Sequence, residues 1–195
     1  MGLSSQEIIE IAIAFVALTA GIAIAIEGIG IIFEPLKMGV LMLALGFTVG
    51  VGFVLHEMAH KATANFFGVP AEFRMWKEGI ILMLITSLVG FVFAAPGAVY
   101  IFANKLKREE NAIISLAGPT TNIVLGSFFV ILAILFPLTL YGVKIFLWGA
   151  KINYFLAFFN LLPIFPLDGS KVIMWNSLVW ILFIGIAFLL GFVFI

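Results

Sequence analysis

The chain has 195 residues, of which 64% are hydrophobic and 10% are charged, with ten basic and ten acidic side chains. A soluble domain of this length carries about a quarter charged residues and roughly half apolar ones, so a soluble fold is excluded. The zero net charge argues against a nucleic-acid partner, and the absence of cysteine excludes disulfides and thiolate chemistry. The sequence therefore predicts an integral membrane protein.

Runs of apolar residues predict where the chain crosses the bilayer, because a spanning helix needs about 20 such residues. The first run follows an N-terminus without the basic segment of a signal peptide, so we expect it to be retained. We expect an all-α polytopic membrane protein of about five to six transmembrane helices, forming a single integral-membrane domain over residues 1–195. The five clear runs are Ile8 to Ile32, Met38 to about Phe66, Ala112 to Phe136, about Val143 to Leu162 and about Val172 to Ile195.

Two histidines and a glutamate stand in the second run, in the segment VLHEMAHKA at 54–62. On a helix, residues four apart lie on one face, so His56 and His60 present two imidazoles as a zinc ion requires. Glu57 lies next to that face, where it can act on a water without ligating the metal. Ionisable side chains inside a membrane helix are rare and usually functional. The alternative is a pair of interfacial histidines near a helix end, followed by Lys61.

A zinc site with two histidines needs a third protein ligand. Asp168 is the only aspartate and follows a helix interrupted by Pro163 and Pro166, in NLLPIFPLDGS at 160–170. Prolines free backbone carbonyls, which in a membrane need a cavity lined by protein or water, so this carboxylate marks a candidate site. The alternative is a helix end with an Asp-Gly turn. Glu27 and Glu34 are outside candidates for the third ligand.

A sixth apolar run, Ile80 to Phe102, is interrupted by Gly90, Pro96 and Gly97. His56 lies roughly 27 Å along its helix from Met38, at 1.5 Å per residue, and Asp168 also follows the far end of a helix. Both can reach one ion only if an odd number of crossings separates His60 from Val143. We therefore expect the run near 80–102 to enter the membrane and return, with its turn near Gly90 or Pro96-Gly97.

The distribution of basic residues supports this topology, since cytoplasmic loops carry an excess of lysine and arginine. With a re-entrant segment, seven basic residues share one side and three fall on or toward the other. We therefore expect the candidate site toward the cytosolic side of the cell membrane, with the N-terminus in the cytosol. The two sets are Lys61, Arg74, Lys77, Lys105, Lys107, Arg108 and Lys171 against Lys37, Lys144 and Lys151.

Three motifs in this order, on separate apolar segments, resemble the site-2 protease family of intramembrane zinc metalloproteases, peptidase family M50. They are HEMAH at 56–60, AGPTTN at 117–122 and NLLPIFPLDG at 160–169, and they anchor roughly residues 40–175. The resemblance implies one zinc per chain and a transmembrane protein as substrate. In the family, the segment between the first two motifs often forms strands or a re-entrant hairpin, which agrees with the re-entrant segment expected here. In this chain that segment is unusually long and apolar. The PDZ and CBS domains of many relatives are not expected.

The resemblance also implies a role for each matching residue. His56, His60 and Asp168 would ligate zinc, Glu57 would be the catalytic acid/base, and Asn160 would engage the scissile backbone. Asn160 could instead cap carbonyls freed by Pro163, and Asn122 could either brace the site or only pack. For Gly118 and Pro119 the sequence favours packing. The residues expected to support the site are Asn122, Pro163, Pro166 and Gly169.

The expected reaction is hydrolysis of peptide bonds within or near transmembrane segments. A transmembrane helix hides its carbonyls in its own hydrogen bonds, so a substrate must unwind locally. The alternating stretch AVYIFA at 98–103 predicts a strand whose edge could bind an extended substrate. Rival interpretations are a divalent-metal transporter that uses the same His/Asp site, and a catalytically silent scaffold.

Overall fold

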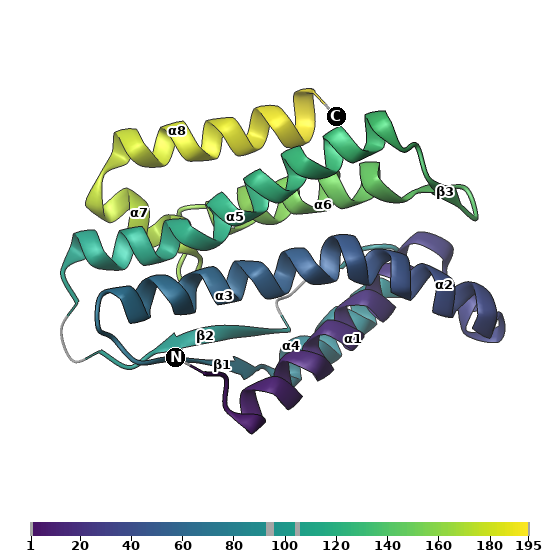
Figure 1. Cartoon of the computed structure of the whole chain (residues 1–195), viewed down its shortest axis with the longest axis horizontal. Coiled ribbons are helices and arrows are strands. Elements are labelled where there is room, and N and C mark those ends of the chain that lie inside the picture. Colours follow the sequence, from purple (N-terminus) through teal and green to yellow (C-terminus); the bar gives the residue numbers. More distant parts are fainter. Residues whose placement is uncertain (1, 93–95, 104–105, 195) are drawn as a thin grey trace.

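The computed structural model describes residues 2–92, 96–103 and 106–194, which form a helical bundle with two short β-hairpins (Figure 1). The elements in chain order are α1 (Ser5–Glu27), the 3₁₀ helix η1 (Ile29–Phe33), α2 (Pro35–Leu45), the π-helix η2 (Gly46–Gly50), α3 (Val51–Phe66), β1 (Ala71–Met75), α4 (Lys77–Ser87), β2 (Gly97–Ile101), α5 (Arg108–Leu135), β3 (Thr139–Leu140), β4 (Val143–Lys144), α6 (Ile145–Asn160), α7 (Asp168–Trp175), α8 (Ser177–Phe188) and the π-helix η3 (Leu189–Val193).

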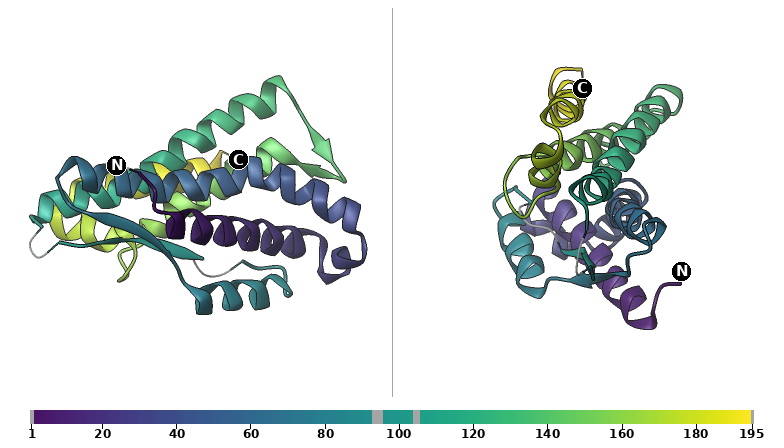
Figure 2. Two further views of the ribbon diagram at one scale, coloured as in Figure 1. Left: turned by 60° about the horizontal axis from the view of Figure 1, so that its bottom comes forward. Right: turned by 90° about the vertical axis from the view of Figure 1, so that its left-hand side faces the viewer.

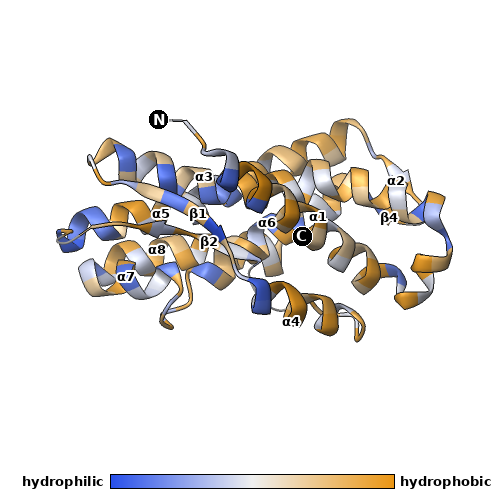
Figure 3. Cartoon of the chain, turned by 90° about the horizontal axis from the view of Figure 1, so that it is seen from below, coloured by the Kyte–Doolittle hydropathy of each residue, from blue (hydrophilic) through white to orange (hydrophobic). Residues whose placement is uncertain are grey.

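Three helical stretches of the described chain are long and apolar enough to cross a membrane. They are α1, the continuous α2–η2–α3 helix over Pro35–Phe66, and α5, and a shorter apolar helix covers Ser177–Val193. Figure 3 shows apolar residues along most of α1, α2 and α4, with hydrophilic residues near the start of α5 and within β1. The expected all-α membrane fold is therefore confirmed.

The fifth expected span differs from the structure. We expected one helix from about Val172, but the chain forms the short helix α7 and then the separate helix α8. The break lies at Asn176, whose side chain accepts hydrogen bonds from the N–H groups of Leu178 and Val179. This is the bond pattern of an N-cap, which starts a new helix.

The apolar run 80–102 reverses direction, as the sequence predicted. Helix α4 packs beside α1 and ends in a turn where Gly90 has a φ of 81°, a conformation that glycine adopts without strain. The chain then comes back as β2, which pairs antiparallel with β1. The expected turn near Gly90 is confirmed, whereas Gly97 begins the returning strand. Residues 93–95 lie outside the described residues.

The register of this hairpin decides which backbone groups face outward. Trp76 N–H donates to Pro96 O and Phe102 N–H donates to Pro70 O, so these two rungs are hydrogen-bonded. Rungs alternate in an antiparallel ladder. In the rung between them that joins Phe73 to Val99, the N–H groups therefore point away from the partner strand.

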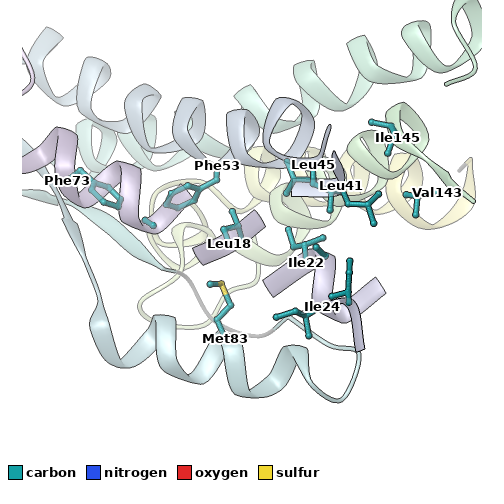
Figure 4. Close-up of a cluster of buried hydrophobic side chains, with 14 residues drawn as sticks. Leu18, Ile22, Ile24, Leu41, Leu45, Phe53, Phe73, Met83, Val143 and Ile145 are labelled. Atoms are coloured by element: carbon teal, nitrogen blue, oxygen red, sulfur yellow. The ribbon is translucent and has the colours of Figure 1, made fainter. Parts of the chain in front are cut away.

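Helix α3 occupies the middle of the molecule. It packs against β1 and β2 on one side and against α5 on the other, while α5 also contacts α6 and α7 (Figures 1 and 2). A buried cluster joins α1, the α2–α3 helix, α4 and β1. Figure 4 shows Leu18, Leu45, Phe53, Phe73 and Met83 within it. This packing fixes α3 between the hairpin and the α5–α7 layer.

Candidate metal centre

Three side chains of types that can ligate a metal meet where α3 approaches the start of α7. His56 and His60 lie one turn apart on α3, and their Nε2 atoms are 3.0 Å apart. Asp168, the first residue of α7, places Oδ2 at 3.6 Å from Nε2 of His56 and 3.2 Å from Nε2 of His60. All three residues are buried, at 5%, 8% and 9% exposure.

These distances match the requirements of a zinc ion. Zinc binds imidazole nitrogen at about 2.0–2.1 Å and carboxylate oxygen at about 2.0–2.2 Å in a tetrahedron, so its ligand atoms lie about 3.3 Å from one another. The three observed separations of 3.0, 3.2 and 3.6 Å surround that value. Two imidazoles and a carboxylate form a donor set known from zinc enzymes. The residues therefore fit the metal.

The outer nitrogen of each imidazole has a hydrogen-bond acceptor. Nδ1 of His56 lies 2.5 Å from Oδ1 of Asn122, and Nδ1 of His60 lies 2.7 Å from the carbonyl oxygen of Ile114. A carbonyl can only accept, so Nδ1 of His60 carries the proton. Its Nε2 lone pair then points at the cluster, as metal ligation requires. Asn122, for which the sequence left bracing and packing open, contacts His56 directly.

Gly118 of α5 lies against the two imidazoles. A Cβ atom at this position would be 2.5 Å from Nε2 of both His56 and His60. The sequence favoured packing for Gly118, and the structure specifies its partner, because only a glycine leaves the inner nitrogens uncovered.

Asp168 is positioned by Lys171 of α7 together with the loop before α7. Lys171 Nζ lies 3.6 Å from the other carboxylate oxygen, Oδ1, and donates to the carbonyl oxygen of Pro166 at 2.8 Å. A Cβ at Gly169 would overlap the backbone of Leu161, so the absence of a side chain lets α7 start close to the end of α6. Pro163 lies exposed in the same loop.

Glu57 is a buried residue of α3 whose side chain contacts β2. Its Oε2 accepts a hydrogen bond of 2.8 Å from the N–H of Val99, one of the outward-facing groups of the hairpin. A strand was expected from the sequence at 98–103, and β2 covers Gly97–Ile101. Its contact with Glu57 was not expected, because a backbone N–H leaves no mark in a sequence.

Asn160 makes a different contact from the one that the resemblance implied. Its Nδ2 donates to the carbonyl oxygen of Leu156 at 3.0 Å, one turn back at the end of α6. Leu156 lies seven residues before Pro163, so its carbonyl is not one that this proline frees. The role of Asn160 toward a substrate stays a prediction.

The outside candidates for the third ligand lie elsewhere. Glu27 ends α1 and forms an ion pair with Lys37, and Glu34 lies just before α2. The start of α1 lies beside α3 near His60, so Glu27 is about 30 Å away at 1.5 Å per residue.

A third buried carboxylate, besides Asp168 and Glu57, escaped the sequence analysis. Glu7, 1% exposed, forms an ion pair with Lys61 and accepts the N–H of Phe73 at 3.1 Å. Glu10 accepts the N–H of Met75 at 2.9 Å. Two carboxylates of α1 thus occupy the outer edge of β1 and place the start of α1 beside the histidine end of α3.

Comparison with curated proteins finds relatives along most of the chain. "Putative zinc metalloprotease MJ0611" of Methanocaldococcus jannaschii is 45% identical over 163 residues, which cover 82% of this chain and 84% of the relative. "Putative zinc metalloprotease YwhC" of Bacillus subtilis is 30% identical over 73% of this chain and 71% of its own length. "Zinc metalloprotease MJ0392" of M. jannaschii is 27% identical over 77% of this chain, but the match covers only 38% of that relative. No family model matches the chain, and no solved structure matches it.

Proposed function

We propose, from the premise that this chain belongs to the zinc metalloprotease family of these relatives, that it is an intramembrane protease of the site-2 type. It hydrolyses peptide bonds within or near transmembrane segments of other membrane proteins. The observation that carries the proposal is the convergence of His56, His60 and Asp168 from α3 and α7. Glu57 follows His56 in the sequence and is held by the N–H of Val99.

The proposed metal is one zinc ion per chain, held by the two Nε2 atoms and by Oδ2 of Asp168. Zinc, when bound in this way, polarises a carbonyl and lowers the pKa of water toward about 7. The protein keeps the ligands in place through the acceptors of their outer nitrogens and through Lys171.

Glu57 is the proposed acid/base. It takes a proton from the attacking water and delivers it to the leaving amine. The bond from Val99 N–H holds Oε2 and so fixes the orientation of the carboxylate before a substrate arrives. Asn160 would serve the developing oxyanion only after its bond to Leu156 is released.

The substrate is proposed to bind as an extended segment along the outer edge of β2. The edge lies beside Glu57, which holds the outward N–H of Val99, so an added strand would pair with the other outward groups of β2. The outer edge of β1 is occupied by α1, which directs a substrate to β2. Transmembrane segments with Gly, Pro or Asn would unwind most readily to fit.

The candidate site is proposed to face the cytosolic side, with the N-terminus on the same side. The excess of basic residues on that side supports this orientation. The ion pair between Glu7 and Lys61 supports it as well, since it places the start of α1 beside the histidines.

The test is cleavage in proteoliposomes. The reporter is a single transmembrane segment that carries an Asn-Pro pair, and its matched control replaces that pair with Leu-Leu. We expect the wild type to cut the first reporter faster than the second and Glu57→Gln to cut neither. Equal cleavage by wild type and Glu57→Gln would reject the proposed mechanism.

The same vesicles test the transporter interpretation. A transporter moves divalent metal across the bilayer and gives Glu57 no proton to transfer. Zinc influx that requires His56 but survives Glu57→Gln, together with no cleavage by the wild type, would favour transport. Absence of both activities in a zinc-loaded protein would favour the scaffold.

A further inference from the structure

Asn153 of α6 is a buried polar side chain that the proposed chemistry does not use. It is 0% exposed, and both the nitrogen and the oxygen of its amide form hydrogen bonds within the protein. Its Nδ2 donates to the carbonyl oxygens of Gly149 at 2.8 Å and Thr48 at 3.3 Å. Its Oδ1 accepts from Nδ2 of Asn122 at 2.8 Å. Asn153 thus links α6 to α5 and to the continuous α2–η2–α3 helix that carries His56 and His60.

The donor and the acceptor of each hydrogen bond in this chain, from Thr48 and Gly149 to His56, can be assigned. The carbonyls of Thr48 and Gly149 can only accept, so the NH₂ group of Asn153 must face them and its oxygen must face Asn122. Asn122 must then donate to Asn153, and it also donates to the carbonyl of Gly52 at 3.2 Å. Its own oxygen therefore faces Nδ1 of His56, which must carry the proton.

The backbone around Asn153 is shaped to admit this chain of bonds. Thr48 lies in the π-helix η2, a rare local form that often occurs at functional sites. A Cβ at Gly52 would overlap the side chain of Asn153, and a Cβ at Gly149 would overlap Thr48. Two glycines thus let α3 and α6 approach closely enough for one amide to bridge them.

We propose that Asn153 is a positioning residue for the metal centre. Acting through Asn122, it holds His56 in the tautomer whose proton is on Nδ1, so that the Nε2 lone pair faces His60 and Asp168. The inference rests on the proposed zinc site. Loss of a partner that orients a metal-bound histidine typically weakens metal affinity 10–100-fold, and we expect an effect in that range.

The first test measures zinc dissociation constants of the full chain in detergent, by competition with a chelator. The variants are Asn153→Leu, Asn122→Ala and the double variant. We expect Asn153→Leu to weaken zinc binding at least tenfold and to add nothing once Asn122 is gone. An unchanged affinity, or a loss of equal size with and without Asn122, would overturn the proposal, because a general packing defect does not depend on Asn122.

A matched control comes from the same two helices. Ser127 and Tyr154 form a hydroxyl–hydroxyl bond of 2.9 Å between α5 and α6, close to the Asn122–Asn153 bond. Tyr154→Phe removes this bond and leaves the amide chain intact. We expect its zinc affinity to equal that of the wild type. A loss as large as that of Asn153→Leu would assign the effect to helix packing and overturn the proposal.

The second test needs no variant that has to fold. The chain has only two histidines, so ¹⁵N spectra of the metal-free wild type report both imidazoles without overlap. We expect neutral His56 to carry its proton on Nδ1, and the Nε2 tautomer would overturn the inference.

The zinc measurements distinguish failure of the proposed function from failure of this inference. A wild type that binds no zinc would contradict the proposed metal centre itself. Zinc binding that Asn153→Leu leaves unchanged would contradict only the role of Asn153.

Discussion

Two buried carboxylates bind the same rung of the small sheet from opposite sides. Glu7 of α1 accepts the N–H of Phe73 on β1, and Glu57 of α3 accepts the N–H of Val99 on β2. Phe73 and Val99 are direct cross-strand partners. The two bonds are chemically alike, so the difference between the two residues comes from their neighbours.

The neighbours assign the two carboxylates to different tasks. Glu7 has the ammonium group of Lys61 beside it, so its charge is compensated and its contacts join α1, α3 and β1. Glu57 lies next to the candidate zinc ligands, where a carboxylate can exchange a proton with water. The same kind of hydrogen bond therefore supports the fold on one side of the sheet and, on the other side, orients the proposed acid/base.

The substitution Glu57→Gln should separate the two carboxylates most clearly. The amide oxygen of glutamine can still accept the Val99 N–H, so the sheet and the zinc content should stay unchanged. Glutamine cannot take a proton, and we expect cleavage to fall about 10²–10⁴-fold. Cleavage rates and zinc content, measured side by side, check this expectation. Glu72→Gln on β1, which loses only its contact with Arg74, is the control. Normal cleavage by Glu57→Gln would contradict its assignment as acid/base.

Glu7→Gln should act on stability instead. It leaves Lys61 buried without its counter-ion, and breaking a buried pair in this way costs about 3–5 kcal/mol. Replacing both partners, in Glu7→Gln with Lys61→Met, should cost less than the single change. Thermal unfolding in detergent measures both. A double variant less stable than Glu7→Gln would show that the pair does not behave as a compensated structural contact.

Val99→Pro tests whether β2 orients Glu57. The N–H of Val99 points away from β1, so proline removes the bond to Glu57 without removing a bond of the ladder. A hydrogen bond to a charged group contributes about 1.5–3 kcal/mol, so we expect cleavage to fall roughly tenfold or more with zinc retained. Tyr100→Pro, which removes a ladder bond, should instead disrupt the hairpin. An unchanged cleavage rate in Val99→Pro would mean that the strand does not orient Glu57.

Glu10→Gln should have the smallest effect. Glu10 is only partly buried, and the glutamine oxygen can still accept the N–H of Met75. We expect the free energy of unfolding to change by less than about 0.5 kcal/mol, as for other surface substitutions. The thermal unfolding midpoint checks this. A loss as large as that of Glu7→Gln would mean that both carboxylates of α1, and not Glu7 alone, hold β1.

Much of this arrangement could be read from the sequence because single residues stand out against an apolar background. The histidine pair and the single aspartate are the clearest examples, and the requirement that they meet also predicted the reversal near Gly90. The fifth span was misjudged because apolar residues on both sides of Asn176 hide the cap that separates α7 from α8.

The contacts that were missed depend on tertiary structure. Glu7 lies in the polar segment SSQE at 4–7, and only the packing of α1 against β1 buries it beside Lys61. Asn153 is one polar residue in an apolar helix, and its partners lie 31 and 105 positions away along the chain. The sequence does not show that residues so far apart along the chain come into contact.

The central claim is that α3 and α7 share one zinc site, and zinc content per chain tests it most directly. The protein is purified in detergent as wild type, Glu57→Gln and Asp168→Ala. The account predicts one zinc in the wild type and in Glu57→Gln, and much less in Asp168→Ala. Full zinc content without Asp168, or no zinc in any of the three under metal-replete conditions, would contradict it.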